Sequence, residues 1–105
     1  MEIEKISIKR DGDYFRVRLA VDGFPVAYDP CVFEFWQIEE RFGAGSERFY
    51  RALAVKCCEA TAIEANYWIA NGRPSMKADR DRAVELIGQL RGGLRNQPAG
   101  ISAAA

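Results

Sequence analysis

Two Asp-Gly pairs, Asp11-Gly12 and Asp22-Gly23, lie in one stretch of alternating apolar and polar residues near the N-terminus. Asp-Gly is a preferred pair for the two-residue turn of a β-hairpin, because such turns need positive φ angles. The stretch therefore predicts three antiparallel strands joined by two tight hairpins. No other feature of the chain constrains the fold as closely.

The strand register follows if each Asp-Gly pair supplies the two central residues of its turn. The first turn then pairs Ile6 with Val17, and the second pairs Leu19 with Val26. Both turns place apolar side chains on the same face of the sheet, and a one-residue slip would invert the faces. The residues predicted to lie under the helices are Ile6, Ile8, Phe15, Val17, Leu19, Val21, Phe24, Val26 and Tyr28.

The opposite face of the predicted sheet is basic. It carries Lys5, Lys9, Arg16 and Arg18, with Tyr14 among them. This face is a candidate surface for a nucleic acid, whose phosphates would contact the cations while a base stacks on Tyr14. It also fits the acidic surface of a protein partner, which the balance of charges in the chain favours over a nucleic acid. A third interpretation is a solvated face whose charges prevent edge-to-edge aggregation.

Three helices are expected after the strands. Asp29-Pro30 supplies an N-cap and a first helical residue. Ser46 caps the second helix, and Gly92-Gly93 ends the third. The expected ranges are 30–42, 47–70 and, from Ser75 or Lys77, up to Leu90.

Strands followed by helices predict an α+β domain with two layers, in the order βββααα. The strands form a three-stranded antiparallel meander in the order 1-2-3, and the three helices pack on one face. Pro25 suits an edge strand, because proline has no backbone N–H. The prediction is a single domain over residues 1–94, followed by a disordered tail over residues 95–105.

The composition argues against several kinds of catalytic site. The chain has no histidine, the commonest general base and metal ligand. Cys57 and Cys58 are adjacent on a predicted helix, so their side chains diverge and do not form a C-x2-C metal pair. With Cys31 they are expected to be small buried residues. We therefore expect no catalytic residue, no cofactor, no metal site and no enzymatic activity.

Charge and hydropathy narrow the possible partners. The chain has 15 basic and 15 acidic residues and no net charge, which weakens the nucleic-acid interpretation. The N-terminus has no apolar signal segment, and no apolar run is long enough to span a bilayer. We expect a cytoplasmic protein that does not enter a membrane.

Aromatic and apolar helix residues indicate contacts with other proteins. Trp36 lies outside the apolar stripe of its helix, and it either completes the core or anchors a partner. The helix over residues 47–70 is apolar on most of its surface, which indicates either a central position or burial by a partner chain, for example in a homodimer.

These features favour a small, non-enzymatic protein-interaction module. An inhibitor or regulator encoded by a phage or another mobile element, for example against a host defence system, is one form that such a module takes. The alternative is a nucleic-acid-binding protein that uses the basic face of its sheet. The predicted partner-binding residues are Lys5, Lys9, Tyr14, Arg16, Arg18 and Trp36.

Overall fold

The computed structural model describes residues 1–95. Its elements, in chain order, are β1 (Ile3–Asp11), β2 (Tyr14–Val21), β3 (Phe24–Tyr28), α1 (Val32–Phe42), α2 (Glu47–Ala70), the 3-10 turn η1 (Pro74–Met76) and α3 (Lys77–Arg95). The strands form one antiparallel sheet in the order β1-β2-β3, which confirms the predicted βββααα fold. The expected disordered tail lies outside the described residues, apart from Arg95, which ends α3.

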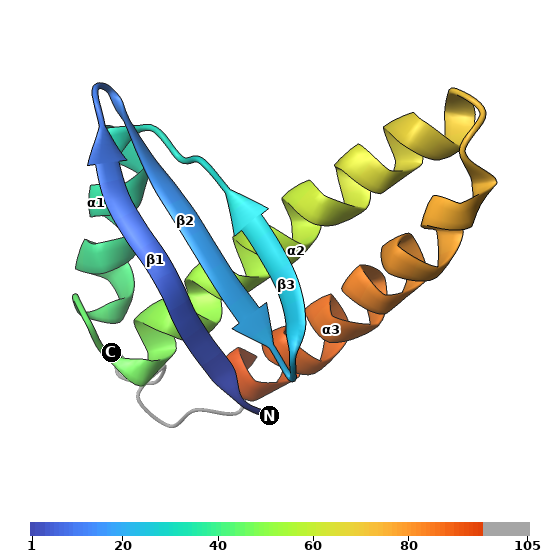
Figure 1. Ribbon diagram of the computed structural model, residues 1–105. Coiled ribbons are helices and arrows are strands. Elements are labelled where there is room, and N and C mark those ends of the chain that lie inside the picture. The colour runs from blue at the N-terminus through green and yellow to red at the C-terminus, as the bar shows by residue number, and fades with distance from the viewer. Residues whose placement is uncertain (96–105) are drawn as a thin grey trace.

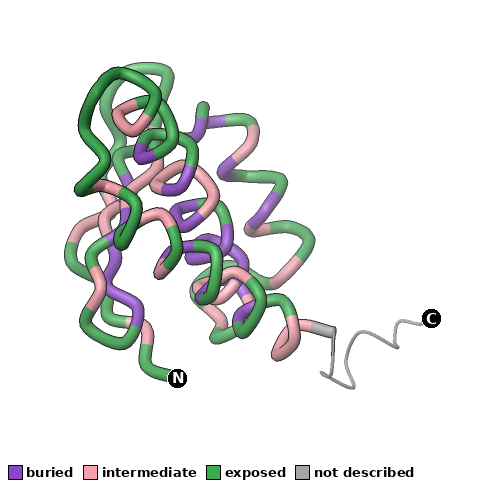
Figure 2. Tube along the Cα trace, turned by 90° about the vertical axis from the view of Figure 1, so that its right-hand side faces the viewer, coloured by how far each residue is buried: buried purple, intermediate pink, exposed green. Residues whose placement is uncertain are grey.

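The sheet forms one layer and the helices form the other (Figure 1). Helix α2 crosses behind the sheet, and the pair formed by α2 and α3 continues beyond the edge at β3. Buried residues are concentrated between the two layers (Figure 2). The largest fully buried apolar side chains come from β2, α2 and α3, and they include Val17, Leu19, Val21, Leu53, Leu86 and Leu90.

The second hairpin has the predicted register. Asp22 and Gly23 are its central residues, and both have positive φ angles, 49° and 81°. This is the geometry of a type I′ turn, which Asp-Gly favours. Leu19 pairs with Val26 as expected, and both side chains are buried.

Strand β3 is an edge strand, as Pro25 predicted. Pro25 lies opposite Ala20, one residue beyond the pair Val21–Phe24 that flanks the turn. Hydrogen-bonded pairs alternate in an antiparallel ladder, so the backbone of Pro25 points away from β2. Proline has no backbone N–H to point toward solvent at this position. The outward-pointing N–H of this short strand is therefore that of Ala27.

The predicted register of the first hairpin is wrong by two residues. Its central residues are Gly12 and Asp13, so Asp11 pairs with Tyr14, and Ile8 pairs with Val17. Only Gly12 has a positive φ angle, 64°, as in a type II′ turn with glycine at the first central position. The start of β2 is also held from its other side, because the Phe15 N–H donates to the Pro30 carbonyl at 2.8 Å.

A β-bulge interrupts β1 at Ile6. Lys5 pairs with Leu19 and Ser7 pairs with Arg18, so Ile6 has no partner on β2. Because of this extra residue, the residues before the bulge point to the opposite face from the one that simple alternation predicts. Ile6 was predicted to be buried, but its side chain is 56% exposed because the bulge removes it from the core-facing series.

Helix α1 begins at a different cap from the one predicted. Cys31 is the N-cap, and its sulfur accepts a hydrogen bond from the Glu34 N–H at 3.4 Å. Asp29 does not cap the helix, because its carboxylate is engaged by Arg18 on the sheet. The expected burial of Cys31 is therefore wrong, since a cap at the start of α1 is exposed.

The two long helices agree with the prediction at all but one end. The hydroxyl of Ser46 accepts the Phe49 N–H at 3.1 Å and caps α2. Helix α3, however, continues through Gly92 and Gly93 to its end at Arg95, where the sequence predicted a stop. Gly93 lies against the guanidinium of Arg51 on α2, and a Cβ atom there would collide with that group. Gly93 therefore lies inside the helix at its contact with α2 and does not end it, and a larger residue there would require Arg51 to move.

Candidate functional site

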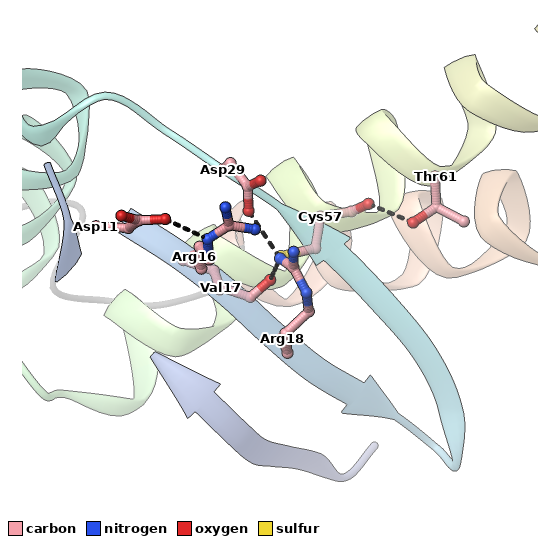
Figure 3. A network of polar contacts seen from close by, with 7 residues as sticks. All are labelled: Asp11, Arg16, Val17, Arg18, Asp29, Cys57 and Thr61. Atoms are coloured by element: carbon pink, nitrogen blue, oxygen red, sulfur yellow. Dashed lines mark hydrogen bonds and ion pairs between the residues drawn. The ribbon is translucent and has the colours of Figure 1, made fainter. Parts of the chain in front are cut away.

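The predicted basic face exists in part, and two of its arginines are paired with acids. Arg16 Nε donates to Asp11 at 2.7 Å, and Arg18 Nη1 donates to Asp29 at 2.7 Å (Figure 3). The hydrogen bond and charge of Asp11 raise the pKa of Arg16 above its ordinary value. Exposed pairs of this kind contribute little to stability, but they offset positive charge on the surface.

The two lysines lie on opposite sides of the sheet. Lys9 pairs with Arg16 and remains on the outer face. Lys5 pairs with Leu19, whose side chain is buried under the helices, so the bulge turns Lys5 toward the helix layer. There it lines a hollow with Tyr50 and Arg51 of α2. The structure therefore does not bring the four predicted cations together.

Tyr14 is exposed on the outer face, but its neighbours are acidic as well as basic. It pairs with Asp11 in the ladder. A shallow hollow of about 310 Å³ is lined by Tyr14, Asp11, Arg16 and Asp29. Two carboxylates and one guanidinium beside an aromatic ring give this hollow no excess of positive charge, which is unlike a surface that binds phosphates.

Trp36 is exposed on α1 and is part of a larger aromatic surface. Phe33 lies one turn earlier on the same side of the helix, and the two side chains are 67% and 52% exposed. The Arg10 guanidinium from β1 lies over the Trp36 ring, at 5.9 Å from the ring centre. We call Phe33, Trp36 and Arg10 the α1 aromatic face. The sequence analysis missed Phe33, although its spacing of three residues from Trp36 was a signal.

The inward side of α1 holds this face in place. Phe35 stacks on Phe15 of β2 with a distance of 3.9 Å between ring centres, and it meets Phe49 of α2 edge-on at 5.6 Å. The Val32 N–H donates to the Asp13 carbonyl at 2.9 Å. Packing and hydrogen bonds thus fix α1 to both the sheet and α2, so its outer residues are presented on a rigid support.

A hollow of about 320 Å³ separates α1 from α2 and α3. Its floor is apolar, and most of the charges around it are paired within the chain. Glu34 accepts a hydrogen bond from the Tyr28 hydroxyl at 2.8 Å and lies 3.9 Å from Lys56. Arg91 is paired with Glu59. This hollow therefore offers few free charges to a ligand.

The buried cysteines are not activated as nucleophiles. Burial raises the pKa of Cys57 from 9.0 to about 12 and that of Cys58 to about 11. Both thiols are therefore neutral at pH 7, and a neutral thiol is a poor nucleophile and metal ligand. Within residues 1–95, no cluster of three or more cysteine, aspartate or glutamate side chains could hold a metal ion.

Comparisons with protein-family models, curated proteins and solved structures found no match to this chain. Over the part of the chain that the structure describes, none of the helices has the length and hydropathy needed to cross a membrane.

Proposed function

We propose that this protein is a non-enzymatic interaction module that binds a protein partner through the α1 aromatic face. The observation that carries the proposal is the exposure of Phe33 and Trp36 one turn apart on a solvent-facing helix surface, with Arg10 over the Trp36 ring. Tryptophan and arginine are the residues most often found at the energetic centre of protein interfaces.

The rigid mounting of α1 supports the same proposal. A helix whose inner side is already stacked on Phe15 and Phe49 loses little conformational entropy when its outer side is covered. Charged and polar residues surround the aromatic pair, among them Gln37 and Glu40. An apolar centre with a polar rim is the usual anatomy of a specific interface.

The biological role we propose is that of an inhibitor or regulator, such as those encoded by phages and other mobile elements. A protein with this role needs a stable fold and one well-formed binding surface, and it needs no catalytic group. The proposal leads to a specific expectation: the partner carries an apolar pocket that accepts Trp36.

Nucleic-acid binding by the outer sheet face is the weaker alternative. Arg16 and Arg18 each donate to a carboxylate, and Lys5 belongs to the other side of the sheet. Lys9 is left as the one predicted cation of this face with no acidic side chain in ion-pair contact among the described residues. A single lysine provides a small counterion-release contribution to affinity.

Affinity capture with matched variants tests the proposal. The bait is the purified protein, and the test variant combines Phe33→Ser with Trp36→Ala. The control variant is Ile63→Ser, which removes an equally exposed apolar side chain from α2. We expect a partner that is retained by the wild type and the control and is lost by the α1 variant.

A titration with the purified partner completes the test. Truncation of a central interface residue costs about 2 kcal/mol or more, so Trp36→Ala alone should raise Kd by about thirtyfold. Equal affinity of the wild type and this variant for every captured protein would overturn the role of the α1 aromatic face. Single-stranded DNA titrated at low salt tests the alternative, and salt-sensitive binding that Lys9→Glu abolishes would support it.

A further inference from the structure

We infer that a second copy of this chain docks antiparallel on the outer surface of the C-terminal half of α2. Along this surface lie Lys56, Ala60, Ile63, Tyr67 and Ala70, separated alternately by four and three residues. We call this row the α2 seam. Ile63 and Tyr67, in its middle, are 70% and 60% exposed. An alternating spacing of four and three is the pattern by which one helix packs along another.

From Ala60 onward, the α2 seam is uncovered because α1, which lies over the N-terminal half, does not extend along it. Ala52 and Lys56 of α2 line the hollow beneath α1, so α1 occupies this side of the N-terminal half. Beyond the sheet edge at β3, α2 continues with α3 alongside it (Figure 1). Ala62 and Ala65 of this half are buried, whereas Ile63 and Tyr67 remain exposed.

The size and charge of the seam residues fit a second copy. In an antiparallel pair centred on Ile63, each Tyr67 meets the small Ala60 of the other copy, so a large residue packs on a small one. Lys56, which lies 3.9 Å from Glu34 of its own chain, is then also beside the last turn of the other α2, which has no basic residue of its own. A cation at a helix C-terminus is favourable. The net charge of zero adds no long-range repulsion between two copies.

The position of α1 favours the antiparallel arrangement over the parallel one. Because α1 covers the N-terminal half of this side of α2, a parallel partner would bring two α1 helices against each other. An antiparallel partner places each α1 beyond the C-terminal end of the other α2. Only the antiparallel pair therefore allows the two exposed halves to meet along their length.

Sedimentation equilibrium tests the dimer directly. We expect the wild type to be a dimer at tens of micromolar and Ile63→Glu to be a monomer, because the substitution places two charges at the centre of the pair. Phe33→Glu is the matched control, since Phe33 is equally exposed but lies on α1, and it should remain a dimer. A wild type that is monomeric at this concentration, or an Ile63→Glu variant that dimerises as the wild type does, overturns the inference.

Disulfide trapping tests the orientation. In a Cys31→Ser background, Ile63→Cys should give a cross-linked dimer under mild oxidation. The pair Ala60→Cys and Tyr67→Cys, placed on separate chains and mixed, should cross-link faster than Tyr67→Cys with itself. The reverse order would identify a parallel pair and contradict the antiparallel arrangement. This inference does not depend on the α1 aromatic face: Ile63→Glu tests the dimer and Trp36→Ala tests partner binding, so either can fail alone.

Discussion

The two halves of α2 have similar apolar patterns but different surroundings. In the first half, Phe49, Leu53 and Cys57 are buried in the core that α2 shares with the sheet and α1. In the second half, Thr61 and Glu64 still line a hollow with β3, but Ile63 and Tyr67 are exposed, and α2 then continues beyond the edge of the sheet (Figure 1). The burial of an apolar residue here is decided by the length of the neighbouring strands as well as by helical periodicity. One helix can therefore form the core with one half and offer a surface with the other.

Truncation of one apolar side chain in each half gives the largest expected contrast. Leu53→Ala should lower the free energy of unfolding by about 2–5 kcal/mol, because it leaves a cavity in a fully enclosed core. Ile63→Ala should change it by no more than about 0.5 kcal/mol when measured on the monomer, because the side chain is already exposed. Urea denaturation measures both at low protein concentration. Similar losses for the two variants would contradict the division of α2.

An alkaline pH series tests the first half of α2 through its thiols. Burial raises the pKa values of Cys57 and Cys58 to about 12 and about 11, whereas the unfolded chain ionises its thiols near 9.0. The folded state thus retains protons that the unfolded state releases, so the stability is complete below pH 9.0 and falls as the pH rises toward the folded-state pKa values. The expected slope is on the order of 1 kcal/mol per pH unit for each thiol.

The control for the pH series separates the thiols from other groups. Tyr28 contributes in the same direction, because burial and the hydrogen bond to Glu34 raise its pKa from 10.0 to about 12. Cys58→Ala removes one thiol and should make the decline in urea stability shallower, and Tyr28→Phe should do so at higher pH. A decline that is unchanged in Cys58→Ala would show that this thiol is accessible to water.

The smallest expected effect concerns a polar link in the second half of α2. Arg80 Nη1 on α3 donates to Asn66 Oδ1 at 3.1 Å; Asn66 is exposed and Arg80 is half-buried. Asn66→Ala should lower stability by less than about 1 kcal/mol. Hydrogen exchange should nevertheless become faster for the backbone amides of residues 66–70, while those of residues 52–58 keep their protection. A uniform change along α2 would show that the two halves open together.

Local turn chemistry explains which parts of the sheet could be predicted. The second hairpin was predictable because Asp22 and Gly23 both adopt the positive φ angles that Asp-Gly favours. The first Asp-Gly pair is equally good as a turn, but Gly12 with Asp13 gives a second acceptable turn. The choice between them depends on contacts with the chain after β3, such as the hydrogen bond from Phe15 to Pro30. Such contacts between distant segments leave no local pattern in the sequence.

The candidate site shows the same limit. The exposure of Trp36 and Tyr14 was one of two outcomes that the sequence allowed, and helical spacing could have added Phe33. The pairing of Arg18 with Asp29 was not predicted because Asp29 was taken as the helix cap, whereas Cys31 caps α1 and the Asp29 carboxylate accepts from Arg18. The position of Lys5 on the helix side of the sheet could be predicted only if the bulge at Ile6 were known. Each difference follows from one or two residues that changed the local register.

The proline at the edge of β3 has a consequence for how copies of this protein assemble. Fibre growth by strand addition needs a template with a row of free backbone donors. Pro25, which lies opposite Ala20, removes one of the few outward backbone N–H groups of β3. On the other edge, β1 carries a bulge and charged side chains. Both edges of the native sheet are therefore poor templates for strand addition. This leaves contacts between helices, such as the antiparallel pair that we propose, as the favoured route to self-association, and such a pair stops at two copies.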